Sequence, residues 1–296
     1  MAKIRFVSRA FREATLLLIN TCNEIIATYS AQGYTLTLRQ LFYQLVSRNI
    51  VPNTERSYKN VGNAVSDGRL AGLIDWDAIE DRVRVPRRAS EFRNLRELAE
   101  AAISSYRLPR WDGQDMYAEL WVEKDALAGV LEPIAREWHA VLMVNRGYSS
   151  QSAMFEASRR FRRAERAGMK PVLLYLGDHD PSGEDMVRDV TDRLAMFGVE
   201  VDVRKIALTM AQVEEYNPPP NPAKMTDSRA AAYVELHGAQ SWEVDALPPN
   251  VLVELINTAF AEIVDVETMD AIKEREEADK VRLLEAVEGI MRGGAE

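Results

Sequence analysis

The sequence contains a single cysteine, Cys22, among its 296 residues. One cysteine excludes a disulfide framework and a cysteine-rich zinc site, and it suits a reducing compartment. Long apolar runs are also missing: residues 15–20 (TLLLIN) fall far short of the roughly 20 residues that span a bilayer. The first residues, MAKIRFVSRAF, lack the apolar core of a signal peptide. We therefore expect a soluble, cytoplasmic protein.

The composition is that of a globular protein. Hydrophobic residues make up 47% of the chain and charged residues 28%, so the chain can bury a core, which excludes a disordered or fibrous protein. At roughly 100 to 200 residues per domain, the length fits two domains or one large one. The sequence has no internal repeat and no low-complexity segment.

Charge is distributed unevenly along the chain. The formal net charge is −9, but residues 1–110 carry 17 basic against 11 acidic residues, and the remainder carries 20 against 35. Six arginines fall within fifteen positions: Arg82, Arg84, Arg87, Arg88, Arg93 and Arg96. A basic N-terminal third beside an acidic body predicts contact with a polyanion at one end of the molecule. The alternative is a solvated, charged helix face.

Residues 1 to about 95 have the pattern of short helices separated by turns. Thr37 is a suitable N-cap for a helix that ends at residues 51–53 (VPN). The apolar residues of this helix have the spacing of one buried side: Leu38, Leu41, Phe42, Leu45 and Val46. A second helix is predicted over 54–70, with Gly72 as its stop. Short helices with a basic surface are typical of helix-turn-helix and winged-helix modules.

The pattern changes after residues 107–115 (RLPRWDGQD), which we interpret as a linker. Apolar strand-like runs then alternate with longer helical stretches, which predicts βαβ units, a parallel sheet and an α/β fold. The strands are expected at 117–122, 140–144, 172–176 and 199–203, and the helices near 125–137, 150–167 and 183–196. The proline-rich segment 217–222 interrupts this pattern, and 250–291 is expected to form one or two helices.

Three carboxylates follow strands of the predicted sheet. Glu123 ends the first strand, and Asp178 and Asp180 follow the third. Because functional groups gather beyond the carboxyl ends of parallel strands, we expect all three at one edge. Carboxylates held close together repel one another unless a cation neutralises them, and oxygen ligands favour Mg²⁺ or Mn²⁺, which suits phosphoryl transfer. Two alternatives stay open. Glu123 and Lys124 could simply begin a helix, where a carboxylate suits the helix dipole, and the Asp-x-Asp-Pro segment could form a turn in which the aspartates bond the backbone.

The order of these motifs resembles the Toprim domain of topoisomerases, primases and related nucleases. The matching segments are VEKDA (122–126), Arg146-Gly147-Tyr148 and GDHDPSGEDM (177–186). Within that superfamily they look most like the A subunit of topoisomerase VI and its relative, the meiotic double-strand-break transesterase. The motifs are specific when found in this order, and they cover roughly residues 116–205.

The resemblance implies a domain order and a metal site. The expected parts are a winged-helix domain (1–106), the linker, a Toprim domain (116–225) and a helical C-terminal extension (226–296). Mg²⁺, or alternatively Mn²⁺, would be held by three carboxylates: Glu123, Asp178 and Asp180. Glu123 would also be the general acid/base for the leaving oxygen.

The resemblance also implies contacts with double-stranded DNA. Lys124 and Arg146 would lie near the phosphates. Arg69 lies in a segment, 66–72 (SDGRLAG), that looks like the family's winged-helix segment near DNA. Gly147 would lie in the turn after the second strand.

A tyrosine completes the resemblance. The family carries a catalytic tyrosine near a motif Arg-x-x-aromatic-Tyr, and residues 39–43 here read RQLFY. On a helical wheel of about 100° per residue, Arg39 and Tyr43 lie off the apolar stripe and one turn apart on the same side. A tyrosine that faces away from the core beside a guanidinium can attack a phosphodiester, and Arg39 would stabilise the developing charge. The alternative is an amphipathic tyrosine at the rim of a core.

The resemblance implies partners as well. In the family, the tyrosine of one protomer meets the metal of the other, which implies a homodimer. The chain has no glycine-rich nucleotide-binding motif and no Walker lysine, so strand passage would need a separate ATPase (B-type) subunit. It is similar to shortened, stand-alone A-subunit homologues. The tail beyond residue 207 has no counterpart, and in its segment 243–249 (EVDALPP) we interpret Glu243 and Asp245 as a surface turn, although either could add a carboxylate to the site.

Three hypotheses about function follow. The first is a Mg²⁺-dependent DNA-cleaving transesterase, type IIB topoisomerase A-subunit-like, in which Tyr43 becomes linked to the 5′ end of the break. The second is a Toprim nuclease in which a metal-activated water attacks and Tyr43 is structural. The third is a DNA-binding accessory protein that does not cut. The three histidines, His139, His179 and His237, are expected to be structural or exposed.

Overall fold

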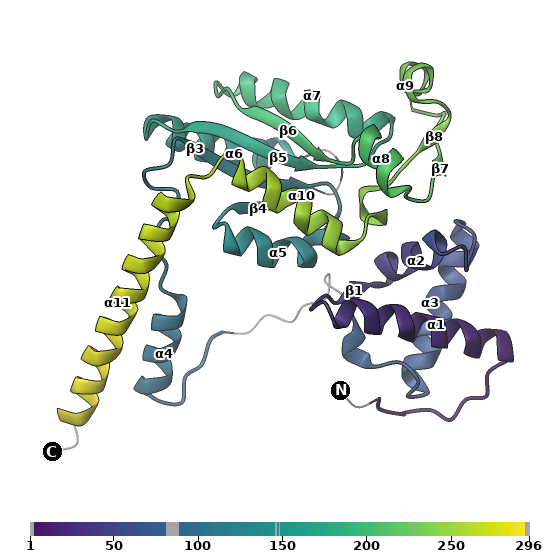
Figure 1. Cartoon of the computed structure of the whole chain (residues 1–296), viewed down its shortest axis with the longest axis horizontal. Coiled ribbons are helices and arrows are strands. Elements are labelled where there is room, and N and C mark those ends of the chain that lie inside the picture. The colour runs from purple at the N-terminus through teal and green to yellow at the C-terminus, as the bar shows by residue number, and fades with distance from the viewer. Residues whose placement is uncertain (1–2, 81–88, 146, 148, 228, 294–296) are drawn as a thin grey trace.

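The computed structural model describes residues 3–80, 89–145, 147, 149–227 and 229–293. Within these residues the protein is an α/β structure with eleven α-helices and a four-stranded parallel sheet (Figure 1). The strands lie in the order β4 (Val141–Val144), β3 (Met116–Val122), β5 (Lys170–Leu176) and β6 (Asp202–Ala207). The α/β class and the parallel sheet expected from the sequence are confirmed.

Helices cover both faces of the sheet. Side chains of α5 (Ala128–Glu137) and α10 (Pro249–Ala261) share a core with Leu120 and Val122 of β3. On the other face, α6 (Gln151–Arg166) and α7 (Pro181–Met196) pack on Trp121, which lies between Leu120 and Val122 in β3. Because successive residues of a strand face opposite sides, a strand buried on both faces is mostly apolar, as β3 and β5 are apart from Glu119 and Lys170.

The fourth strand begins later than its apolar pattern suggests. A strand was expected at 199–203, whereas β6 runs from Asp202 to Ala207. Val199 and Val201 are buried against α6 and α7 in the irregular segment that follows Gly198, whose φ of 75° ends the helix. Their apolar character therefore reflects burial outside the strand and not strand pairing.

The N-terminal unit is a small helical bundle with its own core. It contains α1 (Glu13–Ser30), α2 (Leu38–Ser47) and α3 (Glu55–Leu70), and a two-residue parallel ladder joins β1 (Leu36–Thr37) to β2 (Ile79–Glu80). The helices expected after Thr37 and over 54–70 are present. At the start of α2, Thr37 and Gln40 form a capping box, in which each side chain accepts a hydrogen bond from the backbone N–H of the other residue.

Short elements lead from the sheet back to this bundle. After α8 (Met210–Tyr216), β7 (Asn221–Pro222) pairs antiparallel with β8 (Gln240–Ser241), and α9 (Ala230–His237) lies between them in sequence. A short 3-10 turn, η3 (Val244–Ala246), follows β8 and packs against α2. The sheet domain and the helical bundle therefore meet at η3.

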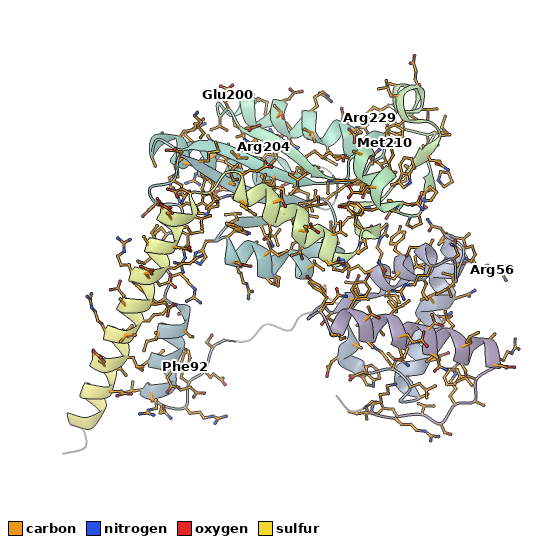
Figure 2. The ribbon with its side chains drawn as sticks, viewed as in Figure 1. Arg56, Phe92, Glu200, Arg204, Met210 and Arg229 are labelled. Carbon is orange, nitrogen blue, oxygen red and sulfur yellow. The ribbon has the colours of Figure 1, made fainter. Side chains whose placement is uncertain are left out.

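A two-helix arm extends from the end of the sheet that lies away from the helical bundle (Figure 1). The long helix α11 (Val266–Gly293) runs alongside α4 (Leu95–Ser105), which falls within the range 1–106 expected for the N-terminal domain (Figure 1). Phe92 lies near the far end of this arm (Figure 2). Among the described helices, none is both long and apolar enough to cross a bilayer.

Candidate active site

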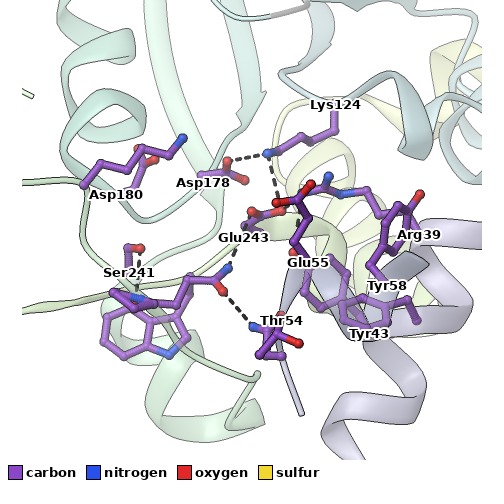
Figure 3. A pocket seen from close by; sticks show the side chains of 16 residues that line it. Arg39, Tyr43, Thr54, Glu55, Tyr58, Lys124, Asp178, Asp180, Ser241 and Glu243 are labelled. Atoms are coloured by element: carbon purple, nitrogen blue, oxygen red, sulfur yellow. Dashed lines mark hydrogen bonds and ion pairs between the residues drawn. The ribbon is translucent and has the colours of Figure 1, made fainter. Parts of the chain in front are cut away.

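A pocket of about 410 Å³ lies where the helical bundle meets the carboxyl edge of the sheet (Figure 3). Its lining comes from both parts of the chain. The bundle contributes Arg39, Phe42, Tyr43, Asn53, Thr54, Glu55 and Tyr58, and the sheet domain contributes Lys124, Asp178, Asp180, Asn221, Pro222, Lys224, Ser241, Trp242 and Glu243. Most of the residues expected to carry chemistry are therefore in or beside one cavity.

Glu123 and Asp178 meet at the sheet edge, as the strand-end rule predicts. Glu123 directly follows β3, and its N–H continues the ladder to the carbonyl of Leu176 at 3.0 Å. Its carboxylate accepts a hydrogen bond from the N–H of Asp178 at 3.2 Å. Burial, together with the nearby charges of Asp178 and Asp180, raises the pKa of Glu123 to about 7. A carboxyl group with that pKa can give or take a proton near neutral pH.

Asp178 is buried and fully engaged. Its Oδ1 accepts a hydrogen bond from the N–H of Val244 at 3.0 Å, and its Oδ2 is 2.6 Å from the ammonium of Lys124. Burial raises the pKa of Asp178 despite the lysine. Lys124 also lies 3.6 Å from Glu243, so its ammonium joins two carboxylates.

Asp180 caps the next helix. Its Oδ1 accepts hydrogen bonds from the N–H of Gly183 at 2.6 Å and from the hydroxyl of Ser182 at 2.9 Å, at the N-terminus of α7. The capping role that a turn motif allows is thus present. The same carboxylate lines the pocket beside Asp178, so the cap does not remove it from the site.

Arg39 and Tyr43 lie side by side on α2, as their spacing predicts. The guanidinium Nη2 of Arg39 is 3.4 Å from the phenol oxygen of Tyr43, and its centre is 5.5 Å from the ring centroid. The expectation that Tyr43 faces away from the core is wrong, because its exposed fraction is only 4%. The turn η3 packs against α2 and covers the side that the helical wheel leaves open to solvent.

Burial and acidic neighbours make the phenol of Tyr43 a weaker acid than that of an ordinary tyrosine. Burial contributes most, and the charges of Asp245 and Glu243 add to it, so that the pKa of Tyr43 lies well above its ordinary value. The guanidinium of Arg39 acts in the opposite direction but does not compensate. In this arrangement the phenol is protonated at neutral pH.

Glu243 and Asp245 belong to the site, and their interpretation as a surface turn is wrong. Arg39 donates through Nε to Asp245 at 2.6 Å and through Nη2 to Glu243. Burial raises the pKa of Asp245 to about 7, and among the described residues its Oδ1 has no hydrogen-bond partner. Burial acts in the same direction on Glu243, but Lys124 and Arg39 outweigh it and hold its pKa at about 2.

The other expected residues lie elsewhere. Arg69 donates to the carbonyls of Trp76 and Ile79 and stacks over the Trp76 ring, so it holds the turn after α3. Arg146 and Tyr148 are outside the described residues, as are Arg82, Arg84, Arg87 and Arg88. Gly147 has a φ of 82°, which suits the tight turn expected there.

His179 is structural, as expected. It is buried, its Nδ1 is 2.8 Å from the hydroxyl of Tyr233, and it packs edge-on against His237. Its backbone exchanges two hydrogen bonds with Trp242, which ties the loop after β5 to the segment before η3.

The donor chemistry fits a hard divalent cation. Five carboxylates gather here: Glu123, Asp178, Asp180, Glu243 and Asp245. Arg39 pairs with Glu243 and Asp245, and Lys124 pairs with Asp178 and Glu243. A divalent cation would relieve the negative charge that, in addition to burial, raises the pKa of Glu123. As the side chains stand, no cluster of three or more His, Cys, Asp or Glu among the described residues is arranged as a metal site.

Comparisons with known proteins add no family to this description: no family model and no curated protein sequence matches the chain.

Proposed function

We propose that this protein is a Mg²⁺-dependent DNA-cleaving transesterase in which Tyr43 is the nucleophile. The observation that carries the proposal is the shared pocket: Tyr43 and Arg39 from the helical bundle line the same cavity as Lys124 and Asp178 from the sheet edge. A nucleophile, two cations suited to a phosphate and an acidic edge are the parts that cleavage of a phosphodiester needs.

The residues divide the reaction as follows. The Tyr43 phenol gives its proton to water as its oxygen attacks the phosphorus; the bond to the 3′ oxygen breaks, and a 5′-phosphotyrosyl link forms. Arg39 and Lys124 balance the charge that develops on the phosphate oxygens. Glu123 acts as the general acid and donates the proton that the leaving 3′ oxygen takes. Glu123, Asp178 and Asp180 would hold Mg²⁺ or Mn²⁺, which would polarise the phosphate.

The finer structural predictions belong to the same proposal. The four-stranded parallel sheet with Glu123 and Asp178 at its carboxyl edge is compatible with a Toprim-type domain. We propose that the helical bundle is the winged-helix DNA-binding domain and that Arg69 and Arg146 lie near the DNA. We also propose that the protein is a homodimer and acts with a separate ATPase subunit, because the motifs resemble those of a family that has both.

The deciding experiment uses supercoiled plasmid with Mg²⁺ or Mn²⁺, a detergent quench, and electrophoresis with and without protease. With the wild-type protein we expect broken DNA that enters the gel only after protease treatment. Tyr43→Phe should give no such DNA but should still bind DNA. Tyr58→Phe is the matched control, because Tyr58 lines the same pocket from α3. Removal of the cation with EDTA should stop cleavage. Protein-linked breaks that persist in Tyr43→Phe would refute the assignment.

One observation favours a second candidate, a hydrolytic Toprim nuclease. Tyr43 is buried, and its phenol is held by Arg39 and Glu243, as a structural tyrosine would be. In a nuclease, a metal-activated water replaces the phenol as nucleophile. Breaks that need no protease, survive Tyr43→Phe and disappear in Asp178→Ala would establish this function. If the protein binds DNA and neither metal supports breaks, either a partner subunit is missing from the assay or the protein is a non-cleaving accessory protein.

A further inference from the structure

The carboxylate of Glu243 lies among the groups to which the proposed function assigns the phosphate (Figure 3). It accepts a hydrogen bond from Arg39, it is 3.6 Å from the ammonium of Lys124, and its charge lies close enough to the phenol of Tyr43 to raise the pKa of that group. Asn221 approaches its other oxygen at 3.5 Å. One protein carboxylate therefore lies close to the nucleophile and to both cations at once.

A phosphodiester would compete for the same contacts. Carboxylate and phosphate oxygens are both bound by the donor fork of arginine and by the ammonium of lysine. Each of these cations also has a second acidic partner, because Arg39 binds Asp245 and Lys124 binds Asp178. A DNA phosphate that enters the pocket therefore meets cations that already have anionic partners. The carboxylate of Glu243 occupies the position that the phosphate would take.

From this arrangement we infer that Glu243 occupies the phosphate subsite as an internal substitute for the substrate and keeps the site closed until DNA displaces it. The inference rests on the proposed function. It assigns Arg39, Lys124 and Tyr43 to one anion subsite and gives Glu243 an inhibitory role.

The surroundings of Glu243 indicate how it leaves. The backbone is fixed on both sides, because Trp242 exchanges two hydrogen bonds with His179 and the N–H of Val244 binds Asp178. The side chain of Glu243, in contrast, is 25% exposed and has a path to solvent. Glu243 therefore vacates the subsite by rotation of its side chain. Asp245, whose side chain is fully buried, stays and keeps Arg39 oriented.

The test is the variant Glu243→Gln, which keeps the size of the side chain and removes its charge. Binding is measured by fluorescence anisotropy with a short labelled DNA duplex at low salt, in the Tyr43→Phe background so that cleavage does not interfere. We expect the dissociation constant to fall on the order of tenfold, since a like charge facing the phosphate is removed. With Tyr43 intact, Glu243→Gln should also form more protein-linked breaks.

The control is Glu55→Gln, which removes a carboxylate from the same pocket. Glu55 is exposed and pairs with Lys59 on its own helix, so its loss should change the dissociation constant less than twofold. Glu243→Ala serves as a second variant and should shift affinity in the same direction, and thermal unfolding verifies that each variant is folded.

The outcomes separate the two proposals. If the Tyr43→Phe protein binds DNA and Glu243→Gln and Glu243→Ala bind no more tightly than Glu55→Gln, the inference is wrong and the proposed function is unaffected. If no variant binds DNA even at low salt, both are wrong. Tighter binding by both Glu243 variants, without a matching change in Glu55→Gln, supports the inference.

Discussion

At the scale of single residues, Gly183 shows how closely the site is built. The loop after β5 folds back on the start of α7, and a Cβ added to Gly183 would lie 2.2 Å from the carbonyl oxygen of Asp178. That distance is far inside van der Waals contact with backbone, which cannot move aside as a flexible side chain would. Glycine is required here because of the close approach of the chain, and it fixes Asp178 relative to the cap residue Asp180.

Gly183→Ala should therefore disturb the site. We expect stability to fall by about 1–3 kcal/mol as the loop shifts, and protein-linked breaks to fall more than tenfold because Asp178 moves. Thermal unfolding and the plasmid assay measure the two effects. Gly289→Ala is the control: a Cβ at this exposed position of α11 meets nothing within 4 Å, and alanine favours helix. Equal behaviour of the two variants would contradict this account.

The residues of the site differ in how far the sequence predicts them. Glu123 and Asp178 could be placed together because each follows a parallel strand, and a general rule brings strand ends to one edge. Arg39 and Tyr43 could be paired because four residues make one helical turn. The burial of Tyr43 could not be predicted, since it depends on η3, some 200 residues away, and no local pattern specifies that contact. For the same reason Asp245 looked like part of a surface turn.

At the scale of elements, the two-helix arm is anchored by one buried carboxylate. Glu276 of α11 accepts hydrogen bonds from the N–H of Leu108 at 2.8 Å and from Lys280 at 2.8 Å, and it pairs with the buried Arg110 at 2.9 Å. These contacts join α11 to the segment that connects α4 with β3. The side chain of Glu276 is 1% exposed, so its partners have little access to water as a replacement.

Glu276→Ala should be strongly destabilising, because it leaves Arg110 and the N–H of Leu108 without their partner. Removing one member of a buried ion pair costs about 3–5 kcal/mol. Glu277→Ala, one position along the same helix, removes a carboxylate that is 67% exposed and should cost less than about 1 kcal/mol. Urea unfolding followed by circular dichroism compares them. A loss in Glu276→Ala no larger than in Glu277→Ala would show that this carboxylate does not anchor the arm.

The elements themselves were largely predictable, and their partners were not. The alternation of apolar strands and helices predicted β3, β4 and β5 close to their observed bounds, because each of these strands is mostly apolar. The packing of α4 on α11 had no such signal. Among the residues of α4 none is fully buried, and Leu95 and Leu98 are exposed, so its sequence does not specify a partner.

At the scale of the whole molecule, the pocket combines two parts of one chain. The tyrosine helix α2 and the acidic edge of the sheet are held together by Arg39, which binds Glu243 and Asp245 across the boundary. The family resemblance implies a different pairing, in which the tyrosine of one protomer meets the metal of its partner. Both arrangements use the same side chains, and they differ in which chain supplies them.

A mixture of two inactive variants distinguishes these arrangements. Tyr43→Phe lacks the nucleophile and Asp178→Ala lacks a carboxylate, so neither should form protein-linked breaks alone. Because Tyr43 and Asp178 of one chain line one pocket, we expect the mixture to remain inactive, whereas wild-type protein mixed with Tyr43→Phe should keep its activity in proportion to its share. Breaks in the mixture would mean that Tyr43 of one chain works with Asp178 of another. The intrachain contact of Arg39 with Glu243 would then belong only to the closed state, and its release would have to precede assembly of the active pair.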